Sequence, residues 1–191
     1  MALDSESRWK LVRKLKARGQ EQSRPSEINI RPALVDDLVS VTEIYNFYIA
    51  NSVVTFDIEA MTTADWETKF HWIQGLGLPF IVAESEGKQI IGFAYVAPWR
   101  QKAAYRRTVE DSIYLRPAAT GKRAGTKLLE TLIAESKAAG VKEIVAVISD
   151  KGAEASIALH ERFGFKHQGH LGKVGFKFGR WLGTVLMQKS L

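Results

Sequence analysis

A basic, glycine-containing turn lies at residues 120–126, where the chain reads TGKRAGT between an apolar segment and an amphipathic helical pattern. A helix start leaves backbone N–H groups unpaired and carries partial positive charge, so such a turn can bind phosphate. Lys122, Arg123 and Lys127 add full charges there. The spacing is neither that of a P-loop nor that of a dinucleotide-binding fingerprint. Spacing alone leaves two interpretations open, an anion site and a plain connection with a solvated basic surface.

The distribution of charge narrows the class of anionic partner. The 191-residue chain carries 27 Lys and Arg against 21 Asp and Glu, a formal net charge of +6. Residues 1–27 hold seven of the basic residues, and residues 100–127 hold eight against two acids, so the remainder is slightly acidic. A nucleic-acid-binding domain more often carries positive charge over the whole module. The concentrated charge therefore favours a small anionic ligand over a nucleic acid.

The composition excludes several classes of protein. Hydrophobic residues make up 46% and charged residues 25%, which is typical of a globular domain. The sequence has no cysteine, which excludes a disulfide scaffold, a thiol nucleophile and a cysteine metal site. It has no apolar run long enough to cross a bilayer. We expect a cytoplasmic protein with no metal site.

Residues 1–27 are predicted to be a basic helical extension and linker, and residues 28–191 a single domain. Apolar residues in the extension have roughly helical spacing, with basic residues between them. It lacks the apolar core of a secretory signal. A targeting peptide, a membrane-surface helix and a short docking helix all remain open for it.

Apolar periodicity predicts a mixed α/β domain around one sheet. Helices are expected at residues 34–50, 62–75, 126–139 and 153–163. Strands are expected at residues 28–32, 79–85, 89–97, 105–115, 143–149, 165–170 and 174–189. The nearly continuous apolar run at 143–149 is typical of a buried parallel strand. The predicted order is β-α-α-β-β-β-α-β-α-β-β.

Several longer segments resemble a known superfamily. They are IRPA at 30–33, IYNFYIANSVVTFD at 44–57, YVAPWRQKAAYRRTVEDSIYLRP at 95–117, ASIALHERFGF at 155–165 and VGFKFGRWLGTVLMQ at 174–188. With the basic turn, they resemble the GNAT N-acetyltransferases over residues 28–189, in particular the phosphinothricin and methionine-sulfoximine N-acetyltransferase subfamily. The resemblance implies an α/β GNAT acyl-CoA N-acyltransferase fold, with a central mixed, mostly antiparallel sheet flanked by helices. It also implies a homodimer.

By the same resemblance, acetyl-CoA is the cofactor. The strand before the turn would pair its backbone with the pantetheine, and the main-chain N–H groups of the turn would hold the pyrophosphate. The implied cofactor-binding residues are Ile113, Tyr114, Leu115, Gly121, Lys122, Arg123, Ala124, Gly125, Thr126 and Ser156. Three positions depart from the subfamily's pattern: Thr120 replaces an Arg or Gln, Arg123 replaces a Gly, and Ala153 replaces an Asn. We expect binding with altered geometry.

Acetyl transfer needs a neutral amine, donors for an oxyanion and stabilisation of a leaving thiolate. The resemblance implies that Glu110 accepts the ammonium proton, that His160 is the catalytic histidine and that the N–H of Leu115 is the oxyanion donor. Without the resemblance, Glu110 is an ordinary exposed strand residue and His160 a helix histidine bonded in the core. Because the sequence has no cysteine and no Ser/His/Asp order stands out, direct attack by the amine is expected.

The expected substrate is the α-amine of a small amino acid or analogue, whose carboxylate an arginine would bind. The implied substrate-binding residues are Phe56, Trp99, Arg100, Gln101, Lys102, Tyr105, Arg106, Glu110, Asp111 and Ser112. One alternative keeps the fold and uses a polyamine, an aminoglycoside or a protein N-terminus. Another, from a different class, is a non-catalytic module that binds CoA or a nucleic acid. The preferred interpretation has neither a nucleic-acid nor a membrane partner.

Overall fold

The computed structural model describes residues 27–191. Seven strands form one sheet in the order β1-β2-β3-β4-β5-β7-β6. Their bounds are β1 Ile28–Pro32, β2 Phe80–Ser85, β3 Ile90–Pro98, β4 Thr108–Leu115, β5 Glu143–Ser149, β6 Lys166–Lys177 and β7 Arg180–Ser190. Every neighbouring pair is antiparallel except β4 and β5, which are parallel. The predicted mixed, mostly antiparallel sheet is therefore confirmed.

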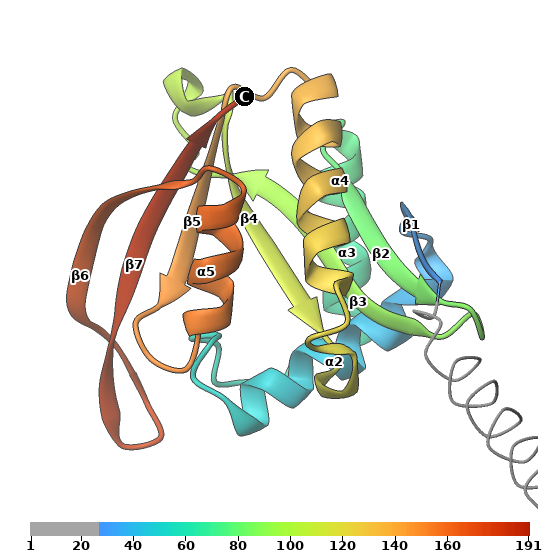
Figure 1. Cartoon of the computed structure of the whole chain (residues 1–191), viewed down its shortest axis with the longest axis horizontal. Coiled ribbons are helices and arrows are strands. Elements are labelled where there is room, and N and C mark those ends of the chain that lie inside the picture. The colour runs from blue at the N-terminus through green and yellow to red at the C-terminus, as the bar shows by residue number, and fades with distance from the viewer. Residues whose placement is uncertain (1–26) are drawn as a thin grey trace, which may run out of the picture.

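Helices cover both faces of the sheet. Helices α2 (Leu38–Asn51) and α3 (Thr63–Gly75) lie on one face, and α4 (Ala124–Ala138) and α5 (Glu154–Arg162) lie on the other (Figure 1). Side chains alternate along each strand. On β2, Phe80 and Val82 join the core under α2 and α3, whereas Ile81 and Ala83 join the core under α4. Each face of the sheet thus has its own hydrophobic core.

Local signals explain most of the element ends. Helix α3 begins after Thr62, whose hydroxyl accepts a hydrogen bond from the backbone N–H of Asp65, as in a capping box. Strand β4 begins later than predicted because residues Ala103–Tyr105 form a short 3-10 helix. Helix α4 begins at Ala124, earlier than predicted, directly after Arg123 in the left-handed conformation.

The prediction for the last two strands was wrong about where the chain turns. The sequence prediction placed a break at residues 171–173, but β6 continues to Lys177 and the turn lies at Phe178 and Gly179. Both turn residues have positive φ, 50° and 72°, as in a type I′ hairpin turn. The glycine-rich stretch between Leu171 and Gly175 is instead a register shift within the strand pair. Glycine marks bulges as well as turns, which is why the pattern misled.

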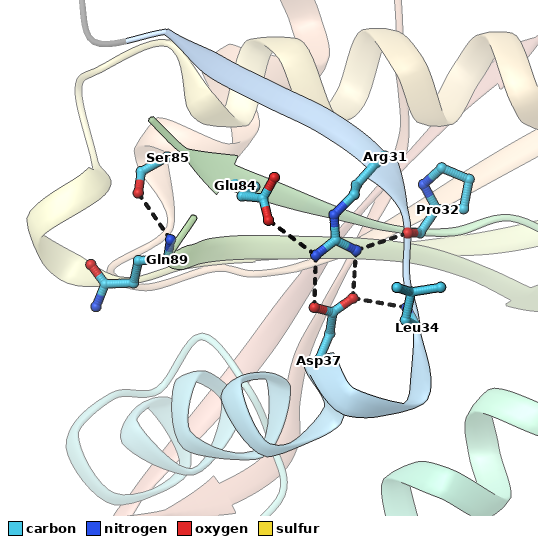
Figure 2. Close-up of polar contacts among 7 residues, drawn as sticks. All are labelled: Arg31, Pro32, Leu34, Asp37, Glu84, Ser85 and Gln89. Carbon is cyan, nitrogen blue, oxygen red and sulfur yellow. Dashed lines mark hydrogen bonds and ion pairs between the residues drawn. The ribbon is translucent and has the colours of Figure 1, made fainter. Parts of the chain in front are cut away.

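A polar cluster links β1 to the start of the helical layer (Figure 2). The guanidinium of Arg31 donates to both carboxylate oxygens of Asp37, at 2.6 and 2.9 Å, and to Glu84 on β2 at 3.3 Å. Asp37 also accepts from the backbone N–H of Leu34. Burial raises the pKa of Asp37, but its bonds to Arg31 and Leu34 outweigh that effect and lower it. The cluster therefore fixes the first strand against its neighbour and against α2.

Within residues 27–191, no helix is long and apolar enough to cross a membrane. The predicted basic extension lies almost wholly outside the described residues. The domain boundary at residues 27 and 28 accordingly stays a prediction.

Candidate active site

A cleft opens where β4 and β5 separate. The two strands pair only over Thr108–Glu110 on β4, opposite residues 143–145 of β5. Beyond Glu110 they diverge, as Figure 1 shows. The cleft has a volume of about 580 Å³, and β4, β5, α5 and the start of α4 contribute its walls. A strand that loses its neighbour in mid-course keeps unpaired backbone groups on that side.

The backbone of β4 presents N–H groups to this cleft. The even-numbered residues of β4 form backbone hydrogen bonds with β3. This follows from the strand register and from two bonds at its ends, Trp99 N–H to Thr108 O and Arg116 N–H to Ile91 O. In an antiparallel ladder the alternate positions point the other way. The N–H groups of Ile113 and Leu115 therefore point away from β3, towards the cleft. The carbonyl of Leu115 is already bonded to the hydroxyl of Tyr48 at 2.7 Å.

The turn after β4 keeps a glycine-like backbone. Gly121 and Arg123 have φ values of 75° and 66°, a region that side chains other than glycine rarely adopt. Arg123 is thus strained but preserves the turn that precedes α4. The predicted turn residues Gly121, Arg123, Gly125 and Thr126 line the cleft, together with Thr120, whereas Lys122 and Ala124 do not. The hydroxyl of Thr120 donates to the carbonyl of Pro117, so its hydrogen bond lies within the turn itself.

Glu110 lies in the cleft wall at the point where the strands separate. Burial raises the pKa of Glu110, and the charge of Asp111 raises it further. Lys69 on α3 and Arg100 lower it in part. A carboxyl whose pKa lies above its ordinary value is better matched to proton transfer near neutral pH.

His160 and Asp111 form a buried pair in the same cleft. Their side chains are 4% and 2% exposed, and Nε2 of His160 lies 2.9 Å from Oδ2 of Asp111. The other ring nitrogen, Nδ1, lies 2.7 Å from the carbonyl of Ser156. Burial lowers the pKa of His160, but the charge and hydrogen bond of Asp111 and the bond to Ser156 outweigh it, so the pKa is raised. Ser112, Ile113, Tyr114, Leu115 and Ser156 also line the cleft.

The predicted substrate loop does not line this cleft. Trp99 is partly buried, and the side chains after it are exposed, namely Arg100, Gln101, Lys102, Tyr105 and Arg106. The guanidinium of Arg100 lies over the ring of Trp99, 4.9 Å from its centroid. Because Arg100 still lowers the pKa of Glu110, the loop lies close enough to act electrostatically on the cleft.

Phe56 is held by the C-terminal hairpin. A Cβ on Gly175 of β6 would lie 2.5 Å from the ring of Phe56, so the ring packs directly on glycine backbone. Lys177, only 4% exposed, donates to the carbonyl of Thr55 at 2.9 Å. Burial lowers the pKa of Lys177, and Asp57 opposes this in part. The hairpin thus fixes the loop between α2 and α3, a contact that sequence reasoning missed.

Other cleft residues were also missed by the sequence analysis. They are Tyr48, Val54, Ala146, Val147, Ile148, Gly152, Ala155, Leu159 and Arg162. The apolar run of β5 predicted a strand but gave no sign that part of it would border a cleft. Ala153, the position that departs from the subfamily's asparagine, does line the cleft.

Comparisons with known proteins place this geometry in a family. A model of the acetyltransferase (GNAT) family matches residues 41–165. The chain is 39% identical over 162 residues to the phosphinothricin N-acetyltransferase of Alcaligenes faecalis, covering 85% of this chain and 82% of that protein. It is 37% identical over 163 residues to the L-methionine sulfoximine/L-methionine sulfone acetyltransferase of Pseudomonas aeruginosa, covering 85% and 94%.

A solved structure agrees with the fold. The GNAT superfamily phosphinothricin acetyltransferase of Sinorhizobium meliloti, in complex with acetyl-CoA, matches with a TM-score of 0.82 and 43% identity, covering 86% of this chain and 88% of that one. The fold and family that the sequence resemblance implied are confirmed. This chain belongs to the acetyltransferase (GNAT) family.

Proposed function

We propose that this protein moves the acetyl group of acetyl-CoA to the α-amine of a small amino acid or analogue of the phosphinothricin or methionine-sulfoximine type. The observation that carries the proposal is the cleft between β4 and β5, which has Glu110 at the point of separation and the basic turn near α4. The named relatives support the substrate class.

The described residues fit acetyl-CoA. The N–H groups of Ile113 and Leu115 are directed at the cleft and can bond the pantetheine, with Tyr114 between them. The turn and helix start can bond the pyrophosphate, since unpaired N–H groups and the helix dipole favour an anion there. Ser156 lines the same cleft from α5. When bound, acetyl-CoA supplies an activated thioester carbonyl.

Glu110 is the proposed proton acceptor, because it borders the cleft and its raised pKa suits proton transfer. The N–H of Leu115, the expected oxyanion donor, lies beside the turn that would bond the pyrophosphate and about 16 Å along the extended strand from Glu110, so we assign it to the pantetheine. The substrate would enter beside the loop after β3, where Arg100 can bind a carboxylate. Phe56 would contact it from the loop after α2.

We further propose that the protein is a homodimer. The hairpin of β6 and β7 exposes five large apolar side chains at 50–59%, namely Leu171, Val174, Phe176, Phe178 and Trp181. An exposed apolar patch of this kind is typical of a protein–protein interaction site. We call these five residues the hairpin patch. Because the same hairpin holds Phe56, a partner that covers the patch would also steady the substrate side of the cleft.

A thiol-release assay with acetyl-CoA and a panel of amines tests the proposal. We expect turnover with methionine sulfoximine, methionine sulfone and phosphinothricin. Turnover restricted to polyamines, aminoglycosides or peptide N-termini would contradict the proposed substrate class but would still support acetyl transfer. Tight acetyl-CoA binding without turnover of any amine would overturn the enzymatic function. Salt-sensitive binding of DNA or RNA without thiol release would support the non-catalytic alternative.

A further inference from the structure

We propose that His160 is a positioning residue, whose imidazolium forms an ion pair with Asp111 that links α5 to β4 across the cleft. In this role it does not exchange a proton with the substrate or with the leaving thiol. The proposal rests on the proposed acetyltransferase function for its kinetic consequences, but the structural link itself does not depend on it.

The first step concerns Nδ1 of the ring. It lies 2.7 Å from the carbonyl oxygen of Ser156. A carbonyl oxygen can only accept a hydrogen bond, so Nδ1 must carry a proton and donate it. The ring therefore has one proton fixed on the side that faces its own helix.

The second step concerns Nε2, which lies 2.9 Å from Oδ2 of Asp111. If the carboxyl is ionised, Nε2 carries a proton and the ring is an imidazolium. If the carboxyl is protonated, its O–H points at Nε2 and occupies the lone pair. In neither case is a lone pair free to accept a proton from an amine. The raised pKa of His160 agrees with the imidazolium form, and a histidine held between two acceptors is the usual way to stabilise it.

The third step concerns what the pair holds in place. Asp111 follows Glu110, the last residue of β4 that pairs with β5. His160 is the only residue of the nine in α5 that is fully buried. The ring of Phe165 packs edge-on against the imidazole at 4.8 Å. Helix α5, which contributes Ala155, Ser156 and Leu159 to the cleft, is thus attached to the splayed strand by a buried ion pair.

The pair also explains why removal of His160 should disturb the structure. Oδ1 of Asp111 is buried and has no hydrogen-bond partner among the described residues. Without His160 the carboxylate would have neither oxygen satisfied, and an unpaired buried charge is strongly destabilising. Loss of His160 should therefore move β4 or α5, and acetyl-CoA binding should respond before the chemical step does.

The direct test is long-range ¹H–¹⁵N NMR on the full chain, with the His160 signal assigned by its loss in His160→Gln. We expect both ring nitrogens of His160 to be protonated at pH 7.5. A neutral ring with an unprotonated Nε2 at pH 7.5 would overturn the proposal. This readout needs no substrate, so it decides the matter even if no amine is acetylated.

Kinetics of three variants give the second test. Glutamine in His160→Gln can donate an amide N–H but cannot take up a proton near neutral pH. We expect its kcat to stay within a few-fold of the parent, with an unchanged pH profile of kcat and a raised KM for acetyl-CoA. His160→Ala, which has no donor, should raise that KM further. A fall in kcat of about 10²–10⁴-fold in His160→Gln, with loss of a limb of the pH profile, is the signature of a proton-transfer group and would overturn the proposal.

His167→Gln is the matched control. His167 forms a similar pair with Glu161 at 2.9 Å, but both side chains are about half exposed. We expect no change in kcat, KM or acetyl-CoA affinity by calorimetry. An equal rise in KM in this control would show that the effect of His160→Gln is not specific to the buried pair, and it would count against the proposal.

Discussion

At the scale of single residues, strand geometry gives two neighbouring carboxyl groups different partners and different proposed roles. Glu110 and Asp111 are adjacent on β4, so their side chains point to opposite faces of the sheet. Glu110 is influenced by Lys69 and Arg100, whereas Asp111 is bonded to His160. One carboxyl is therefore left free to exchange a proton, while its neighbour is committed to an ion pair.

The first prediction concerns Glu110→Gln. The glutamine keeps the shape of the side chain but cannot accept a proton, so we expect kcat/KM for the amine to fall by about 10²–10⁴-fold. The remaining activity should lose the dependence on pH that the raised pKa of Glu110 gives the parent. Steady-state kinetics from pH 6 to 9 check this. Full activity across that range would show that another group, or bulk water, takes the proton.

The same substitution should stabilise the fold. Glu110 binds its proton more tightly in the folded protein than in the unfolded one. The free energy of unfolding therefore falls as pH rises from the ordinary value of 4.5 through the raised pKa, and it stays lower at neutral pH. We expect Glu110→Gln to raise Tm at pH 7.5, by about 2–4 °C for each kcal/mol by which the free energy of unfolding increases. The gain should shrink below pH 4.5. An equal gain at all pH values would contradict this.

A third prediction separates strain from charge at Arg123, which has a φ of 66°. A residue with a Cβ pays roughly 1–2 kcal/mol in this region, and glycine does not. Arg123→Gly should therefore raise Tm by about 2–4 °C per kcal/mol relative to Arg123→Ala. Both variants lose the guanidinium, so both should bind acetyl-CoA more weakly by a similar factor. Thermal melts and calorimetry at two salt concentrations check this; equal Tm values for the two variants would contradict the strain.

At the scale of elements, the C-terminal hairpin supports the loop between α2 and α3, which carries the proposed substrate residue Phe56. Lys177 is separated by 122 residues from Thr55, whose carbonyl it bonds. The hydroxyl of Tyr45 donates to Asp57 at 2.6 Å and holds the same loop from α2. The loop that carries Phe56 is thus fixed on two sides, by the hairpin and by a helix.

The fourth prediction tests this support. Lys177→Met keeps the apolar stem but cannot bond Thr55, so Phe56 should be held less well. We expect KM for the amine to rise by about ten-fold, equivalent to roughly 1.4 kcal/mol, with little change in the KM for acetyl-CoA. Lys166→Met, at an exposed position of the same strand, serves as the control. A parallel rise of both KM values in Lys177→Met would point to general loosening instead.

Sequence reasoning succeeded where a pattern is local. The continuous apolar run at residues 143–149 predicted the whole of β5, and the predicted order of elements is observed in full. Sequence reasoning failed at Phe178, because an aromatic residue with positive φ is not a recognisable turn former. It also could not foresee the contacts of Lys177 or His160. Lysine is usually exposed, and Asp111 lies 49 residues from its partner.

At the scale of the whole molecule, the basic residues beside the cleft and the exposed apolar surface lie on different parts of the chain. Eight basic residues fall within residues 100–127, the segment that includes the loop after β3 and the turn before α4. The hairpin patch lies on the far strands of the sheet. Small anions and a protein partner can therefore bind at the same time.

The fifth prediction tests the dimer. The rings of Phe176 and Trp181 pack against each other at 5.4 Å, and both are more than half exposed. We expect the parent to sediment as a dimer and Phe176→Asp/Trp181→Asp to sediment as a monomer with a raised KM for the amine. Val39→Asp, on the exposed side of α2, should leave the dimer intact. A parent that sediments as a monomer at micromolar concentration would exclude the proposed homodimer.

The separation of β4 from β5 has a consequence for the lifetime of the protein. It leaves an unsatisfied sheet edge in the interior, which a second chain could pair with during partial unfolding. A ligand that fills the cleft binds only the folded state and so stabilises it, by about 2.7 kcal/mol at a concentration of 100 times its Kd. Resistance to proteolysis and aggregation should therefore rise with the supply of that ligand. The abundance of the protein would then follow the metabolic state that provides its acyl donor.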